Sequence, residues 1–337
     1  MLRSLVIAPQ WIGDAVMTEP LLRRLSARGE RLTVGALPWV APVYRAMPQV
    51  AEVIEFPFAH GGLQLRARRR LAKQINGQFD IAYICPNSLK SALLPFLAGI
   101  PKRVGYLGEV RVGLLTHRLK NPPKAQRPPM VAFYSALSGE ADFAGDRPRL
   151  LLDPAAVAAT LRQLGLTRQG YHVLAPGAEY GPAKRWPTRH FAALARQLAL
   201  PVVLLGSAKE ADLCAEIELG SRSPDPAKIP PKMINLAGKT SLAQALSVIA
   251  ATKSIVTNDS GLMHVAAGFG VPQVAIFGSS SPLHTPPLNH QATVLWLKNE
   301  PGYQPPLDCA PCFERVCPLG HTRCLVDISA ARVLQYL

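Results

Sequence analysis

The hydrophobic and polar positions alternate between two kinds of segment. Short runs rich in β-branched residues are typical of buried parallel strands, and longer runs with one apolar side are typical of helices. Predicted strands of the first half are Ser4 to Ala8, Leu32 to Ala36, Ile81 to Cys85 and Arg103 to Tyr106, with helices over Met17 to Ala27 and Leu63 to Ile75. In the second half, strands are predicted over His172 to Ala175, Val202 to Gly206, Met233 to Leu236, Ser254 to Thr257, Gln273 to Phe277 and Thr293 to Leu297. This alternation predicts an α/β protein with parallel sheets and crossover helices.

The domain organisation follows from length and from one irregular segment. A chain of 337 residues favours two domains. Asp142 to Pro154 shows little periodicity, so we predict a boundary near Asp153, with domains over residues 1–152 and 153–337 and Pro154 opening a helix. Two doubly wound domains of this kind hold the carboxyl ends of their sheets around one central cleft. The last helix could pack back on the N-terminal domain.

Composition and charge restrict the protein class. Hydrophobic residues make up 48% of the chain and charged residues 18%, which is typical of a globular protein. The apolar stretch from Ser91 to Ile100 is interrupted by Pro95 and is far shorter than a spanning helix, and Leu2 to Pro9 is too brief for a secretory signal. We therefore expect a cytoplasmic protein.

The formal net charge is +15. Basic residues crowd the first half: Arg66, Arg68, Arg69, Arg70, Lys73, Lys102, Arg103, Arg111, Arg118, Lys120 and Lys124. Such a field attracts nucleic acid, anionic lipids or phosphorylated substrates alike. A nucleic-acid-binding protein is the less favoured of these, because no basic stripe is interleaved with aromatic residues.

The first predicted strand leads into a turn that contains Gly13 and Asp14. It has no GxGxxG pattern, so nothing favours a dinucleotide there. Gly13 permits a tight turn, and Asp14 lies where a helix begins. Asp14 could be a capping carboxylate or a general base that reaches an acceptor hydroxyl.

The second half opens with a strand and a loop, Pro176 to Pro187, that precedes a helix. Its glycines, together with Lys184, Arg185 and the helix N-terminus, favour a phosphate site over an exposed basic loop. We expect Trp186 to pack in the core. After the next strand, Glu210 could bind a ribose or could be a surface glutamate at a helix start.

The segment from Ile255 to Ala267 is the most informative. A strand ends in Asn-Asp-Ser-Gly, and the amides of Ser260 and Gly261 begin an apolar helix that suits a diphosphate. Asp259 could hold donor hydroxyls or the loop itself. His264 is either a satisfied buried imidazole or, near Lys184, a phosphate partner.

Four cysteines lie close together near the end of the chain. Cys309, Cys312, Cys317 and Cys324 form C-x2-C-x4-C-x6-C within residues 309–324, with His321 among them. In a cytoplasmic chain this spacing suggests a structural zinc site rather than disulfides, with reduced cysteines in a Pro-rich loop as the alternative.

Four of these segments together resemble the ADP-heptose:lipopolysaccharide heptosyltransferases, which are GT-B glycosyltransferases of family 9. They are the Gln-Trp-Ile-Gly-Asp turn, Pro-Asn-Ser-Leu-Lys-Ser at Pro86 to Ser91, the Pro-Gly-Ala-Glu-Tyr-Gly-Pro-Ala-Lys-Arg-Trp-Pro loop and Asn-Asp-Ser-Gly-Leu-Met-His. The resemblance runs from Leu2 to about Asp327 and is greatest to the heptosyltransferase II branch.

This resemblance implies two Rossmann-like domains and an inverting transfer that requires no metal cofactor. The donor would be ADP-L-glycero-D-manno-heptose, and the acceptor a lipid A-Kdo-heptose at the inner leaflet of the inner membrane, bound by a peripheral monomer. It favours Asp14 as the base. Donor residues would be Gly13, Lys184, Arg185, Glu210, Asp259, Ser260, Gly261 and His264, with Lys184 assisting catalysis.

The basic residues Arg66, Arg68 and Lys90 would meet Kdo carboxylates and phosphates, or else be solvated surface charge. The resemblance also leaves open heptosyltransferase I or another nucleotide-sugar enzyme of this fold, such as an epimerase.

Overall fold

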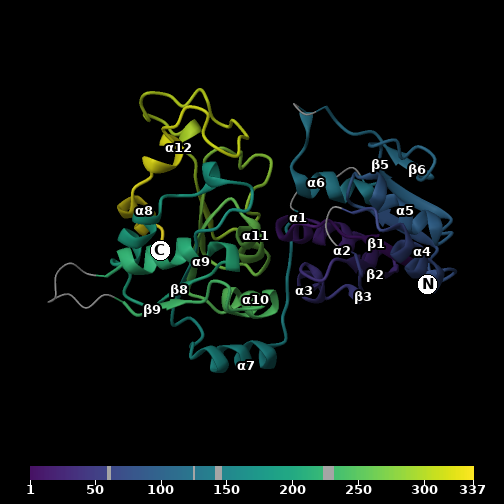
Figure 1. Cartoon of the computed structure of the whole chain (residues 1–337), viewed down its shortest axis with the longest axis horizontal. Helices are drawn as coiled ribbons and strands as arrows, with labels where there is room; N and C mark the ends of the chain where they lie inside the picture. The colour runs from purple at the N-terminus through teal and green to yellow at the C-terminus, as the bar shows by residue number, and fades with distance from the viewer. Residues whose placement is uncertain (59–61, 124–125, 141–145, 223–230) are drawn as a thin grey trace. The chain divides into compact units, whose positions relative to one another are not determined.

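The computed structural model describes residues 1–58, 62–123, 126–140, 146–222 and 231–337. Lys124 and the start of the predicted linker, residues 142–145, lie outside these ranges. The chain divides into two compact units, Met1–Leu151 and Leu152–Leu337 (Figure 1). The sequence predicts this boundary near Asp153, and Pro154 does begin a helix that Asp153 caps by accepting from the Ala155 amide at 3.0 Å.

The first unit contains a parallel sheet with the strand order β3-β2-β1-β4-β5-β6 in the part of the chain described. Its strands are β1 (Arg3–Ile7), β2 (Arg31–Ala36), β3 (Val50–Glu55), β4 (Ile81–Ile84), β5 (Lys102–Tyr106) and β6 (His117–Leu119). Its helices are α1 (Ile12–Met17), α2 (Glu19–Ala27), α3 (Ala41–Arg45), α4 (Leu65–Ile75), α5 (Leu89–Leu97), α6 (Met130–Ser135) and the 3₁₀ turn η2 (Ala136–Ser138). The central strands are buried, as expected for a sheet covered on both faces.

The second unit repeats this topology with the order β12-β11-β10-β7-β8-β9. Its strands are β7 (His172–Ala175), β8 (Val202–Leu204), β9 (Met233–Asn235), β10 (Ser254–Asn258), β11 (Gln273–Ile276) and β12 (Ala292–Leu295). Its helices are α7 (Pro154–Leu164), α8 (Thr188–Ala195), α9 (Ala211–Gly220), α10 (Leu242–Ala250), α11 (Gly261–Gly268), α12 (Arg323–Val326) and α13 (Ala330–Leu334), with 3₁₀ turns η3 (Pro182–Lys184), η4 (Ala208–Glu210) and η5 (Leu297–Asn299).

In both units the third strand along the chain lies at one edge and the order reverses between the first and the fourth. This is the doubly wound order, so the α/β prediction is confirmed. The last helix, α13, packs against α8 of its own unit, beside which the C-terminus lies (Figure 1). Packing of this helix on the first unit, which the sequence left open, stays a prediction. Among the described residues, no helix combines the length and apolar character that crossing a bilayer requires.

Candidate functional site

The strand order marks one place in each sheet where a ligand is expected. In doubly wound sheets, ligands bind beyond the carboxyl ends of the strands where the order reverses. In the first unit these strands are β1 and β4, and in the second they are β7 and β10. The loops that follow these four strands, together with the first turns of the helices after them, contain most of the residues that the sequence singles out. We call the two places the first and second switch points.

At the first switch point, Asp14 lies in the first turn of α1. The N-cap residue of this helix is Trp11, so Asp14 is not the capping residue that one interpretation required. Gly13 is buried just before it. The hydroxyl of Tyr134, on α6, donates to Asp14 Oδ1 at 3.0 Å. This hydrogen bond helps to fix the orientation of the carboxylate.

Three of the groups near Asp14 are neutral acids: Tyr134, Cys85 and Tyr44. Burial, and then the charge of Asp14, raise the pKa of Tyr134 well above its usual value. Burial raises the pKa of the Cys85 thiol too, with Asp14 as the second cause, and it raises the pKa of Tyr44. All three side chains therefore stay protonated near neutral pH, and none of them competes with Asp14 for a proton. This environment suits a carboxylate that acts as a base.

Two of the three predicted acceptor-binding residues line one pocket at the same sheet edge. Arg68 and Lys90 share a pocket of about 40 Å³ with Gln10, Ser88 and Ser91. Arg68 is 7% exposed, donates to the Leu63 carbonyl at 2.7 Å, and lies 4.3 Å from the centre of the Phe58 ring. Burial lowers its pKa. Arg66, on the same helix, is exposed and does not line this pocket.

At the second switch point, Asn258 organises the loop between β7 and α8. Its side chain accepts from the Trp186 amide at 2.9 Å and donates to the Pro176 carbonyl at 2.7 Å. Trp186 is 1% exposed, which confirms its predicted packing role. The Arg185 guanidinium donates to the Ala178 carbonyl at 3.2 Å, which links the two ends of the loop.

Lys184 and Asp259 form the central contact of this site. Lys184 Nζ lies 2.5 Å from Asp259 Oδ2, and the two side chains are 19% and 6% exposed. The hydroxyl of Thr285 also donates to Asp259, at 3.4 Å. Because Asp259 is mostly buried, its charge requires the lysine beside it. The structure thus joins two residues that lie far apart in the sequence and that were predicted to share a site.

The helix α11 begins directly after this pair. Ser260 is its N-cap residue, without a side-chain cap, and Gly261 is its first residue. The first amides of a helix have no partner within it, and the helix dipole favours an anion there. His264 is buried one turn in, and burial lowers its pKa to about 4, opposed by Asp259 and assisted by Lys184. The imidazole is therefore neutral near pH 7.

Glu210 caps the start of the helical segment that follows β8. Its carboxylate accepts from the Ser207 amide at 2.7 Å and the Ser207 hydroxyl at 3.0 Å, completing a capping box. A Cβ at Gly177 would lie 1.7 Å from Glu210 Oε1, so the carboxylate would have to move if another residue replaced this glycine. These contacts fit the helix-start interpretation, and the ribose role stays a prediction.

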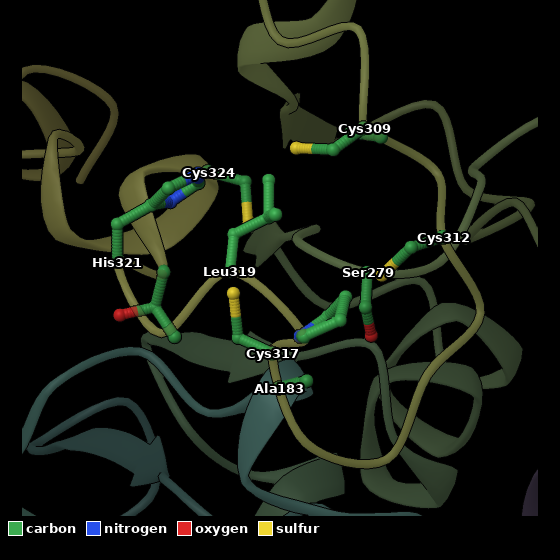
Figure 2. A pocket seen from close by; sticks show the side chains of 11 residues that line it. Ala183, Ser279, Cys309, Cys312, Cys317, Leu319, His321 and Cys324 are labelled. Atoms are coloured by element: carbon green, nitrogen blue, oxygen red, sulfur yellow. The ribbon is translucent and has the colours of Figure 1, made fainter.

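The four clustered cysteines line one small pocket with His321 and Leu319 (Figure 2). Burial raises the pKa of the Cys324 thiol to about 11, and the other three cysteines add to this shift. In the described parts of the chain, no three His, Cys, Asp or Glu side chains are grouped closely enough to hold a metal ion. The side chains as placed do not complete a zinc shell, and zinc binding stays a prediction.

Sequence reasoning did not find Tyr134, Asn258 or Thr285. Tyr134 belongs to a short helix that carries no motif, and its partner Asp14 is 120 residues away. Asn258 belongs to the Asn-Asp-Ser-Gly motif, but only the fold shows that its side-chain amide bonds to both Trp186 and Pro176.

Comparison with known proteins identifies the family to which this chain belongs. A model of glycosyltransferase family 9 (heptosyltransferase) matches residues 68–322. The chain is 42% identical to lipopolysaccharide heptosyltransferase 2 of Escherichia coli K12 over 100% of its length and 97% of the relative's. It is 40% identical to lipooligosaccharide heptosyltransferase 2 of Haemophilus influenzae Rd, covering 87% of this chain and 88% of that one.

Among solved structures, E. coli ADP-heptose LPS heptosyltransferase II superposes with a TM-score of 0.82 and 39% identity, over 99% of this chain and 97% of that one. This match confirms the predicted GT-B fold class. A matched family model over most of the chain, a full-length relative and a shared fold agree: the protein belongs to glycosyltransferase family 9, the heptosyltransferases.

Proposed function

We propose that this glycosyltransferase moves L-glycero-D-manno-heptose from ADP-heptose to the first heptose of the lipopolysaccharide inner core. The relatives named heptosyltransferase 2 support this choice of reaction. The observation that carries it in the structure is the Lys184–Asp259 pair at the N-terminus of α11. A cation, a helix N-terminus and an adjacent carboxylate suit a sugar diphosphate.

In this proposal the second switch point binds the donor. Lys184 and the amides of Ser260 and Gly261 contact the diphosphate, and Asp259 shares the lysine with it or accepts from sugar hydroxyls. Neutral His264 can donate or accept one hydrogen bond without adding charge. Arg185 holds the loop through the Ala178 carbonyl.

The reaction is a single displacement. Asp14 removes the proton from an acceptor hydroxyl, whose oxygen attacks the anomeric carbon of the donor heptose. The bond from that carbon to the diphosphate oxygen breaks, and ADP leaves with the electron pair. Lys184 and the α11 amides stabilise the charge that grows on the diphosphate. Inversion at the anomeric carbon follows from one displacement.

The pocket lined by Arg68 and Lys90 is the proposed contact for anionic groups of the acceptor core. Arg66, exposed on the same helix, would add long-range attraction toward an anionic membrane surface. Peripheral binding at the inner leaflet is part of this proposal.

The main alternative is heptosyltransferase I, which differs in its acceptor. The test supplies ADP-heptose or UDP-sugars together with Kdo-lipid A, either lacking or carrying the first heptose. Turnover that requires both ADP-heptose and the heptose-bearing acceptor supports the proposal. Transfer to the acceptor without heptose would assign the alternative, and turnover with UDP-sugars alone would overturn the donor.

The same assay tests the metal requirement. We propose that transfer proceeds with EDTA present, because protein cations and amides act on the diphosphate. A zinc ion held by the cysteines would be structural, so metal analysis of purified protein and melting temperature with a chelator would report it separately.

A further inference from the structure

Hydrogen bonds join the Cys-rich segment, residues 309–324, to the donor loop, residues 176–187, and to Ser279. Phe313 donates its amide to the Ser279 carbonyl at 2.7 Å, and Ala183 donates to the Arg315 carbonyl at 3.1 Å. The Tyr180 hydroxyl donates to the Phe313 carbonyl at 2.7 Å. These contacts place residues 313–315 beside the turn that carries Lys184.

Gly181 permits this close approach. A Cβ built at Gly181 would lie 2.4 Å from the Arg315 carbonyl oxygen and 3.0 Å from its carbon. Both atoms are backbone, so no side-chain rotation could relieve the overlap. A glycine at this position therefore allows the two segments to touch.

The contact brings a second cation to the ring that Lys184 faces. Lys184 Nζ lies 5.3 Å from the centre of the Tyr180 ring, and Arg315 Cζ lies 5.4 Å from the same point. Both distances lie within the usual range of cation–π contacts. Arg315 is exposed, and among the described residues its guanidinium forms no ion pair or hydrogen bond.

Lys184 and Arg315 differ in whether a carboxylate neutralises their charge. Asp259 compensates Lys184 within an ion pair, whereas no carboxylate of the described residues pairs with Arg315. We propose that Arg315 is a further binding residue for the donor diphosphate, presented to it by the Cys-rich segment. The planar guanidinium can donate two parallel hydrogen bonds to phosphate oxygens, and a diphosphate can accept from two cations at once. This inference rests on the proposed function.

Titration of wild type, Arg315→Ala and Arg315→Lys with ADP, AMP and adenosine tests the assignment. The matched control is Arg189→Ala, which removes an exposed arginine from α8 of the same unit. We expect Arg315→Ala to weaken ADP binding about tenfold, as for one charged hydrogen-bonded contact. Adenosine binding should not change, and Arg315→Lys should recover part of the loss.

An ADP affinity of Arg315→Ala equal to that of Arg189→Ala would overturn the inference. An equal loss for ADP and adenosine would also overturn it, because that pattern indicates a distorted loop. Wild type that fails to bind ADP at all would instead overturn the proposed function.

A second variant tests the presentation by the Cys-rich segment. Tyr180→Phe removes the hydrogen bond to the Phe313 carbonyl and keeps the ring. We expect a smaller loss of ADP affinity, about threefold, with adenosine binding retained. If Tyr180→Phe binds ADP as wild type does, the segment does not need this bond to present Arg315, and that part of the inference is wrong.

Discussion

The two units share one strand order but carry different chemistry at their switch points. In the first unit, the helix after β1 carries a carboxylate, Asp14, near the protonated Tyr134 and Cys85, and Arg68 and Lys90 line a pocket at the same sheet edge. In the second, the loops after β7 and β10 hold an ion pair at a helix N-terminus. The first arrangement suits proton removal from an acceptor that carries anionic groups, and the second suits binding of a diphosphate. The same backbone topology thus positions a site without determining what the site does.

The largest effect expected from this division is on turnover by Asp14→Ala. Loss of the base should reduce the rate at saturating donor by about 100-fold to 10,000-fold. Initial rates of transfer measure it, with circular dichroism to confirm folding. Asp153→Ala is the matched control, because it removes a carboxylate that caps α7. Retention of most activity by Asp14→Ala would show that another group removes the proton.

The next effect is on donor binding by Lys184→Gln. Loss of one charged contact to the diphosphate should weaken ADP binding about 10-fold to 100-fold. Because this variant leaves Asp259 without its partner, Lys184→Gln with Asp259→Asn is measured beside it by calorimetry. Lys209→Gln removes an exposed lysine paired with Glu179 and serves as the control. Unchanged ADP affinity in both Lys184 variants would contradict the donor site.

The buried His264 should make stability depend on pH. Its folded-state pKa of about 4 lies below the usual histidine value of 6.5, so the unfolded chain binds the proton more readily. The contribution is fully present above pH 6.5 and is lost as pH falls toward 4, up to a total on the order of 3 kcal/mol. Urea unfolding at pH 7.5 and pH 5 measures it.

The control for that measurement compares His264→Gln with a change at an exposed histidine, His290→Gln. The loss of stability between the two pH values should shrink in His264→Gln and persist in His290→Gln. Identical losses in the two variants would show that His264 titrates as an ordinary histidine.

The smallest effect concerns Tyr134, which supports Asp14. A hydrogen bond to a carboxylate favours its charged form, so Tyr134→Phe should raise the pKa of the base. We expect the acid limb of kcat/KM to move to higher pH by about 1 unit, with a loss of about threefold or less at pH 8. Tyr106→Phe removes a buried hydroxyl bonded to the Phe133 carbonyl and should leave the limb in place. If kcat/KM depends on pH in the same way in both variants, Tyr134 does not influence the pKa of the base.

The sequence predicts every strand of the second sheet and the four inner strands of the first, but it misses the two edge strands of the first sheet. β3 and β6 were not predicted, since β3 is at most half-buried and β6 has three residues that are largely exposed. Neither gives a hydrophobic period strong enough to recognise. The predicted helix over Met17 to Ala27 corresponds to α2, which begins at Glu19 with Pro20 in its first turn, whereas the short helix α1 before it was not predicted as a separate element.

In the candidate site too, the sequence predicts residues that lie in motifs and misses residues whose role depends on folding. Asp14, Lys184, Asp259 and His264 lie in local motifs, so sequence alone could propose them. Tyr134 and Arg315 lack such a signal, because their partners are brought to them only by folding. Arg68 had a predicted acceptor role, but its burial against Phe58 depends on packing that charge counts do not reveal.

The most direct test of the division between the two switch points is the ADP dissociation constant of Asp14→Ala, measured by titration calorimetry beside wild type. We predict a dissociation constant within about twofold of wild type, because substitutions at separate sites act independently. A loss of affinity as large as that of Lys184→Gln would contradict it, since Asp14 would then belong to the donor site.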